Sequence, residues 1–255
     1  MSEQKKIKVF VISDHPFAPS GVGTQTKYII ETLLKTGRYQ FLCFGGAIKH
    51  DNYQPQKTEQ WGDDWIIFPV DGYPVYNRIK YESTDVIATI SKVTDDVVAN
   101  VAPTVERHYI PHAVDMDIFR PLDEEQINDF RRQQFGEDSE DKFICFWNNR
   151  NARRKMSGSI IWWFNEWAEK VGPDKVRLIM HTDPKDPNGQ DLEAIVSQLN
   201  AHDGRILLSK EKVDPGYLGA MYNMADVTIN LSDAEGFGLA TLESLSCATP
   251  IIVNM

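Results

Sequence analysis

The sequence predicts an α/β protein made of two doubly wound units, each a parallel sheet covered by helices. Short apolar runs rich in Val, Ile and Phe alternate with helical stretches along the 255 residues, which is the pattern of repeated strand–helix–strand units. A polar, acidic stretch over 121–141 interrupts the alternation and predicts a junction near residue 120. The composition, 42% apolar and 25% charged, is close to the globular average and excludes disordered and fibrous classes.

The first unit, residues 1–120, is expected to contain five buried strands and two helices. A helix over Thr24–Thr36 carries apolar residues at helical spacing and closes on Gly37, and Ser91 begins a second helix over Ser91–Val101. The fourteen residues of 71–84, between the third and fourth strands, are just enough for a parallel crossover. Apolar runs bounded by turn residues predict the strands Ile7–Ser13, Tyr39–Phe44, Trp65–Val70, Asp85–Ile90 and Arg107–Ile110.

The second unit, residues 121–255, repeats the alternation more regularly. Its strands are expected at Phe143–Trp147, Val176–His181, Arg205–Leu208, Asp226–Asn230 and Ile251–Val253. Its helices are expected around Glu124–Gln134, Gly158–Val171, Gln190–Asn200, Pro215–Asn223 and Leu239–Cys247. Three tryptophans of the second of these helices fall near one another, and packing in a core or between domains is favoured over a membrane face: Trp162, Trp163 and Trp167.

Charge and cysteine usage restrict the class of protein. Lys and Arg number 27 against 37 Asp and Glu, a net charge of −10, which argues against a general nucleic-acid binder because such proteins need a broad basic footprint. Three cysteines without a C-x-x-C pair favour reduced thiols in a cytoplasmic protein. Apolar runs stay far below the roughly 20 residues of a membrane-spanning helix. The six histidines show no zinc spacing, so we expect no metal.

Two segments at strand ends could hold an anion. Ser20-Gly21-Val22-Gly23-Thr24 lies between the first strand and the first helix, where paired glycines bring backbone amides close to a phosphate; a plain strand–helix turn explains it equally well. Asn148-Asn149-Arg150-Asn151-Ala152-Arg153-Arg154-Lys155 places four cations within six residues after the first strand of the second unit. Arg and Lys suit phosphate oxygens, and a solvated charged turn is the equally weighted alternative.

A third segment combines glycines with two carboxylates. Ser232-Asp233-Ala234-Glu235-Gly236-Phe237-Gly238-Leu239-Ala240-Thr241-Leu242-Glu243 follows a strand and opens a helix. The amides of Phe237, Gly238 and Leu239 can face an anion. Two carboxylates would repel a lone phosphate, but they suit a ligand with hydroxyl groups on both sides of a diphosphate. A nucleotide sugar fits that description.

These motifs together resemble the family-four retaining glycosyltransferases of the GT-B fold. The resemblance rests on Glu235 and Glu243 with seven residues between them, on Arg150 and Lys155 with four, and on the glycines Gly21 and Gly23. It extends to Thr249-Pro250-Ile251-Ile252-Val253, and to Ile110-Pro111-His112-Ala113-Val114-Asp115 with Phe119-Arg120-Pro121, which is similar to the interdomain signature of the family. It implies two Rossmann-like domains facing a cleft: an N-terminal acceptor-side domain and a C-terminal domain that binds the nucleotide-sugar donor.

The resemblance also implies residue roles. Arg150 and Lys155 would hold the donor diphosphate and stabilise the leaving group without a metal, assisted by the amides of Gly238 and Leu239. Glu235 would orient hydroxyls of the donor sugar, and Glu243 would bind the ribose. Gly23 would approach the donor from the first domain.

Departures from the family leave alternatives open. Ala248 replaces a usual glycine, Asn149 stands where glycine is frequent, and both domains are shortened, the first around 72–81 and the second beyond Met255. The expected function is transfer of a sugar from a nucleotide sugar to an unidentified saccharide, lipid or protein acceptor. The alternatives are a nucleotide or nucleotide-sugar binding module without turnover, and a sugar-nucleotide epimerase of the same fold.

Overall fold

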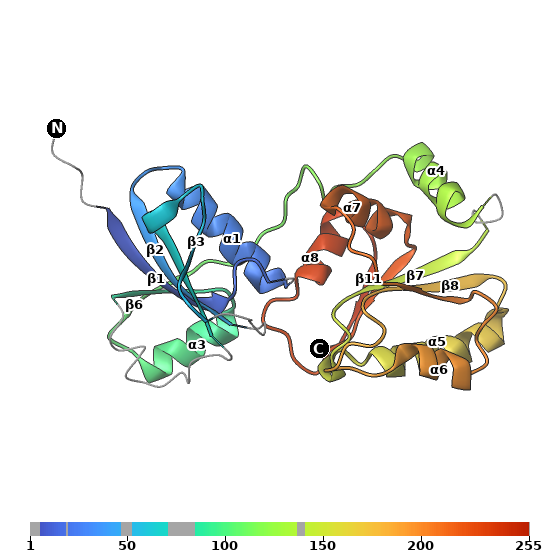
Figure 1. Cartoon of the computed structure of the whole chain (residues 1–255). Helices are drawn as coiled ribbons and strands as arrows, with labels where there is room; N and C mark the ends of the chain where they lie inside the picture. Colours follow the sequence, from blue (N-terminus) through green and yellow to red (C-terminus); the bar gives the residue numbers. More distant parts are fainter. Residues whose placement is uncertain (1–5, 19, 47–52, 71–84, 137–140, 255) are drawn as a thin grey trace. The chain divides into compact units, whose positions relative to one another are not determined.

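The computed structural model describes residues 6–18, 20–46, 53–70, 85–136 and 141–254 (Figure 1). Its contacts divide the chain into two units, Met1–His112 and Ala113–Met255. The division falls after residue 112 rather than near 120, because Phe119 is buried in a core cluster of the second unit. Asn223 of that unit also accepts a hydrogen bond from the amide of Leu122 at 2.8 Å and donates one to the carbonyl of Arg120 at 3.0 Å.

The second unit is a five-stranded parallel sheet in the order β11-β10-β7-β8-β9. The chain builds outward from β7 to β9 and then returns to the other side of β7 with β10 and β11. The order therefore reverses between β7 and β10, and in open α/β sheets ligands bind at the carboxyl ends of the strands at such a point. The strands are β7 (Phe143–Asn148), β8 (Val176–His181), β9 (Ile206–Ser209), β10 (Val227–Asn230) and β11 (Ile251–Val253).

Helices cover both faces of this sheet (Figure 1). Alternate residues of β7 enter opposite cores: Cys145 and Trp147 pack under α5 and α6, and Ile144 and Phe146 pack with α7. Trp147 is fully buried. The helices are α4 (Glu124–Phe135), α5 (Ser157–Val171), α6 (Leu192–Gln198), α7 (Pro215–Met224) and α8 (Leu239–Ser246), with the short 3-10 turn η3 (Arg153–Lys155) before α5.

The expected strands and helices of the second unit are confirmed to within a few residues, but the expected environment of three tryptophans is wrong in part. Trp162, Trp163 and Trp167 are exposed and do not belong to the core of this unit. The buried face of α5 is made instead by Ile160, Ile161, Phe164 and Ala168, which follow a helical period of their own.

Among its described residues, the first unit holds two separately hydrogen-bonded sheets, where we expected the strands of one doubly wound sheet. One has the order β1-β2-β4-β3, with β3 antiparallel to β4, and the other pairs β5 with β6 in parallel. The expected crossover over 71–84 lies outside the described residues. The strands are β1 (Ile7–Asp14), β2 (Tyr39–Gly46), β3 (Gln56–Lys57), β4 (Trp65–Pro69), β5 (Val86–Thr89) and β6 (Glu106–Tyr109).

The core of the first unit lies between the larger sheet and α1 (Gly21–Leu34). Trp65 is fully buried there, beside Ile30 and Phe41. The 3-10 turn η1 (Gly62–Asp64) leads into β4, and α3 (Lys92–Val101) lies between β5 and β6 in the sequence. Within the described ranges, no helix is both long and apolar enough to cross a membrane.

Candidate functional site

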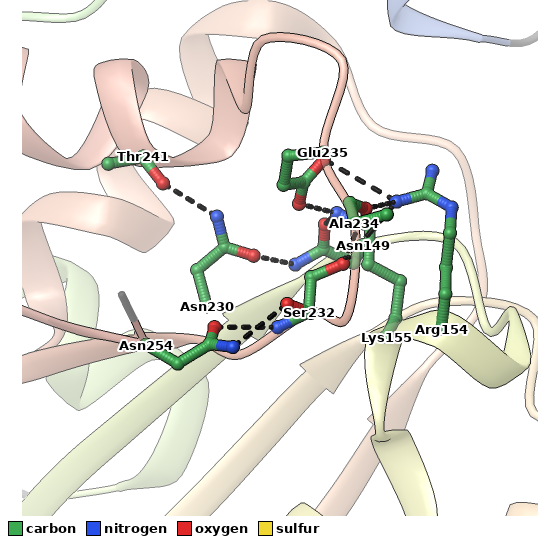
Figure 2. Close-up of polar contacts among 9 residues, drawn as sticks. All are labelled: Asn149, Arg154, Lys155, Asn230, Ser232, Ala234, Glu235, Thr241 and Asn254. Carbon is green, nitrogen blue, oxygen red and sulfur yellow. Dashed lines mark hydrogen bonds and ion pairs between the residues drawn. The ribbon is translucent and has the colours of Figure 1, made fainter.

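The candidate site lies where β7 and β10 end, at the point where the strand order reverses. Asn149 directly follows β7, and its Nδ2 donates to Oδ1 of Asn230, the last residue of β10, at 3.1 Å. Asn230 in turn donates to Oγ1 of Thr241 in α8 at 2.6 Å (Figure 2). Three segments that are far apart in the sequence are thus joined by side-chain hydrogen bonds.

Lys155 and Glu235, predicted as catalytic, form an ion pair in this site. The side chain of Lys155 is 7% exposed and that of Glu235 is 29% exposed. Lys155 also donates to Oδ1 of Asn149 at 2.6 Å. Burial lowers the pKa of Lys155, and the hydrogen bond and charge of Glu235 oppose that shift. One carboxylate and one amide oxygen therefore hold the buried ammonium group of Lys155.

The turn that carries Lys155 is fixed by a buried asparagine. Asn151 donates from Nδ2 to the carbonyl of Gln190 at 2.7 Å and accepts from Oγ of Ser157 at 2.7 Å. A side chain at Gly189 would collide with Asn151, because a Cβ there would lie 2.0 Å from the Asn151 carbonyl oxygen. Met156 has a left-handed φ of +53° immediately before α5, a conformation that is strained for a non-glycine residue.

The loop that carries Glu235 is held from two sides. Arg154 donates from Nη1 to the carbonyl of Ala234 at 2.6 Å. Asn254 exchanges hydrogen bonds with the backbone of Ser232, at 3.0 Å to its amide and 2.9 Å to its carbonyl (Figure 2).

Arg150, the third residue predicted as catalytic, pairs with Asp186. Its Nε and Nη2 reach the two carboxylate oxygens of Asp186 at 2.6 Å and 3.3 Å, while the Arg150 side chain remains 60% exposed. The hydrogen bond from Arg150 is the largest influence that lowers the pKa of Asp186. Part of the positive charge that we expected to face a diphosphate is therefore balanced by Asp186, which lies in the loop between β8 and α6.

Glu243, predicted to bind ribose, lies in α8 and accepts a hydrogen bond from the hydroxyl of Tyr222 at 2.7 Å. Asn148 donates to the same hydroxyl oxygen at 2.9 Å. Burial raises the pKa of Glu243, and the hydrogen bond from Tyr222 opposes that shift. The hydroxyl of a buried tyrosine thus orients this carboxyl group.

The N-terminus of α8 provides backbone amides beside the same loop. Gly238 precedes the helix with a left-handed φ of +85°, which a glycine adopts without strain. Within the described residues, no side chain caps this end, so the amides of the first turn, including that of Leu239, can meet an anion. Phe237, the remaining predicted donor-binding residue of this loop, is partly exposed beside Gly238.

Gly21 and Gly23 begin α1 in the first unit. The helix starts at Gly21, earlier than the expected Thr24, because Oγ of Ser20 accepts from the amide of Gly23 at 3.0 Å. A Cβ at Gly23 would lie 2.6 Å from the carbonyl oxygen of His15. Gly23 is thus required by close backbone packing, whereas Gly21 is exposed.

One pair of carboxylates has the spacing of metal ligands. Asp115 and Asp117 form an Asp-x-Asp pair, but Asp115 accepts from the amide of Asp117 at 2.9 Å and so shapes a turn. Within the described part of the chain, no three His, Cys, Asp or Glu side chains gather as a metal site would require.

Sequence reasoning did not assign a role to several residues of the site. Asn230 and Tyr222 form the hydrogen bonds described above, and Arg154 and Asp186 form ion pairs with charged residues that were predicted. The position of Asn230 at the end of a predicted strand, beside the point where the strand order reverses, could have indicated a site residue. No sequence signal separates Arg154 from its neighbours in a run of cations.

The family model for "Glycosyl transferases group 1" matches residues 128–255. Among curated proteins, the alpha-monoglucosyldiacylglycerol synthase of Streptococcus pneumoniae is 26% identical over 166 residues, which cover 64% of this chain and 36% of the relative. The chain therefore spans little more than a third of the length of that relative.

Solved structures share the fold at low sequence identity. Sucrose-phosphate synthase from Thermosynechococcus elongatus aligns with a TM-score of 0.69 and 16% identity, covering 98% of this chain and 81% of the other. A trehalose-6-phosphate structure from E. coli, described as bound with UDP-2-fluoro glucose, aligns with a TM-score of 0.60 and 10% identity, covering 97% and 84%. The fold is GT-B-like, as predicted. The chain belongs to the group 1 glycosyltransferases.

Proposed function

We propose that the chain transfers a sugar from a nucleotide-sugar donor to an acceptor, with retention of configuration at the transferred carbon and without a metal ion. The observation that carries the proposal is the contact between Lys155 and Glu235 at the carboxyl ends of β7 and β10. A ligand that offers an anion to the ammonium and a hydroxyl to the carboxylate would satisfy both groups. The diphosphate and the sugar of a nucleotide sugar offer them side by side.

Different residues of the site would bind different parts of the donor. Lys155 and the first amides of α8 would take the diphosphate, where they stabilise the charge that grows as the leaving group departs. Arg150 would add a second cation. Glu235 would accept from sugar hydroxyls, and Glu243, oriented by Tyr222, would accept from the ribose. The E. coli neighbour described with a UDP-sugar supports this class of donor.

Donor binding is tested by thermal unfolding with UDP, GDP and ADP and with their glucose and mannose derivatives. At one hundred times its dissociation constant, a ligand stabilises by about 2.7 kcal/mol, which corresponds to a rise of about 5–10 °C for a unit of this size. Lys155→Met should lose the rise with every ligand, and Glu235→Ala should lose the part of the rise that the sugar adds to that of the nucleoside diphosphate. Glu193→Gln, in an exposed ion pair of α6 with Lys185, should keep it and is the matched control.

Two results would contradict this part of the proposal. One is the lack of a shift with any nucleotide or nucleotide sugar. The other concerns the metal: if EDTA removed the shift and magnesium restored it, the diphosphate would depend on a metal rather than on Lys155.

Turnover is tested by following cleavage of the donor by mass spectrometry, with and without acceptors. The panel includes simple saccharides, peptides and diacylglycerol vesicles, the last because the S. pneumoniae relative is named for a glucosylated diacylglycerol. We expect cleavage to accelerate with one acceptor class, and NMR of the product should show the anomeric configuration of the donor. An inverted product would refute retention.

One observation favours a second candidate function, a nucleotide-sugar binding module without turnover. The ion pair of Arg150 with Asp186 balances a charge that a departing diphosphate would use. A binder would show the thermal shift but no acceptor-dependent cleavage.

A further inference from the structure

Arg154 makes a dense set of contacts with the loop that carries Glu235. Its Nη1 donates to the carbonyl of Ala234 at 2.6 Å and lies 3.4 Å from Oγ of Ser232 and 3.5 Å from Oε2 of Glu235. Its own carbonyl accepts from the amide of Asp233 at 2.8 Å. Four consecutive loop residues are therefore bound by one residue of η3. Figure 2 shows the contacts of the Arg154 side chain.

The geometry of these contacts points to restraint of the loop more than to charge attraction. The shortest of the side-chain contacts is to a neutral carbonyl, and the guanidinium is 49% exposed, which weakens its Coulomb interaction with Glu235. Beyond Glu235 the loop passes through Gly236, where a Cβ would meet nothing within 4 Å. Because packing contributes little at that point, the loop backbone before Gly236 depends on hydrogen bonds such as those of Arg154, while the Glu235 carboxylate at its end also pairs with Lys155.

We propose that Arg154 is a positioning residue, which holds the backbone of 233–235 so that Glu235 is presented to the donor sugar in one orientation. The proposal rests on the function proposed above for Glu235. A preorganised carboxylate binds its ligand without a further loss of loop freedom. Arg154 should therefore affect the contribution of the sugar to binding and turnover, and leave the affinity for the nucleoside diphosphate nearly unchanged.

Arg153 provides the matched control, because it carries the same charge in the same turn. Arg153 lines a pocket of about 500 Å³ together with Met156, Ser159 and Asp233, and neither Arg154 nor Glu235 lines that pocket. Arg153→Met thus removes one positive charge near the site and leaves the contacts with Ala234 and Glu235 in place. Arg154→Met removes the same charge together with the contacts.

The experiment compares the full chain with Arg154→Met, Arg154→Lys and Arg153→Met. Amide hydrogen exchange is measured without ligand over residues 230–240, and dissociation constants are measured for UDP and for the UDP-sugar that shifts the unfolding temperature most. In Arg154→Met we expect faster exchange in this segment and a loss of about three- to tenfold in the affinity gained from the sugar, as for one or two lost hydrogen bonds. UDP should bind within about twofold of Arg153→Met, and Arg154→Lys should be intermediate because an ammonium lacks the guanidinium fork.

Several outcomes overturn the proposal. Unchanged exchange in Arg154→Met would show that the loop does not depend on this residue. An equal loss of UDP and UDP-sugar affinity in both Met variants would show that only charge matters. If the unmodified chain bound neither ligand, the proposed function would fail, while the exchange contrast between the two variants would still decide whether Arg154 holds the loop.

Discussion

The ion pair between Lys155 and Glu235 can be tested for its effect on stability separately from its effect on binding. The perturbation is a double-mutant cycle of Lys155→Met, Glu235→Ala and the double variant. The two partners are unequal, because Lys155 is 7% exposed and Glu235 is 29% exposed. If Glu235 is removed, the remaining ammonium is buried, whereas if Lys155 is removed, the remaining carboxylate can reach solvent.

The structure predicts the order of the effects. Glu235→Ala leaves a buried ammonium with Asn149 as its remaining polar contact, which should destabilise the second unit by about 3 kcal/mol, the low end for a broken buried pair. Lys155→Met leaves a carboxylate that is partly exposed and still near Arg154, for a loss of about 1 kcal/mol. The double variant leaves neither charge behind and should lose about 1–2 kcal/mol, which gives a coupling energy of about 2–3 kcal/mol.

Urea unfolding of the second unit measures these values. The control is the same cycle on Lys57 and Asp63, an ion pair of the first unit with both side chains exposed, where we expect a coupling of at most about 0.5 kcal/mol. The reasoning would be refuted if the Lys155–Glu235 coupling were no larger than that of the control, or if Lys155→Met were the more destabilising single change. Nucleotide-sugar binding should be lost in the double variant, although this variant should be more stable than Glu235→Ala alone.

Three further predictions concern single residues of the second unit. Glu243→Gln should raise the unfolding temperature at pH 7, because burial raises the pKa of this carboxyl group in the folded chain. The folded state therefore prefers the neutral carboxyl group. The stability that this preference contributes is fully present below the ordinary pKa and is lost as pH rises through the folded-state pKa, whereas glutamine stays neutral at every pH. The same variant should weaken donor binding, and a gain that persisted unchanged below pH 4 would contradict the assignment. Ala248→Gly should stabilise by about 0.5–1 kcal/mol in urea unfolding, because Ala248 has a left-handed φ of +58° that glycine adopts freely; a loss of stability would contradict this. Asp186→Asn should remove the ion pair that balances the charge of Arg150 and strengthen UDP binding several-fold at low salt, as measured by titration calorimetry; unchanged affinity would place Arg150 outside the site.

Much of the second unit could be predicted because its local signals agree with its fold. Val176–His181 is an apolar run between turn residues, and its predicted and observed bounds are the same. The rule that ligands bind at the carboxyl ends of strands brought the segments of Lys155 and Glu235 into consideration together. Their direct contact, across 80 residues of sequence, depends on side-chain orientations that no sequence pattern encodes.

The first unit was harder to predict because its pairing is set by distant contacts. β3 consists of Gln56 and Lys57, two polar residues that form a strand only by pairing antiparallel with β4. β5 is a short apolar run, whereas β6 carries the polar residues Glu106, Arg107 and His108, and neither composition specifies a partner strand. The early start of α1 could have been found, because Ser20 is a favourable helix cap and lies three residues before Gly23.

The two buried indoles, Trp65 in the first unit and Trp147 in the second, give each unit a fluorescent reporter of its own core. Their emission should shift to longer wavelength when the surrounding core opens to water, and Trp65→Phe or Trp147→Phe would assign each shift. If the units unfold in separate steps, a single transition temperature is not defined for the chain. A nucleotide sugar that is held by the second unit alone would then delay the step reported by Trp147 and leave the step reported by Trp65 where it was.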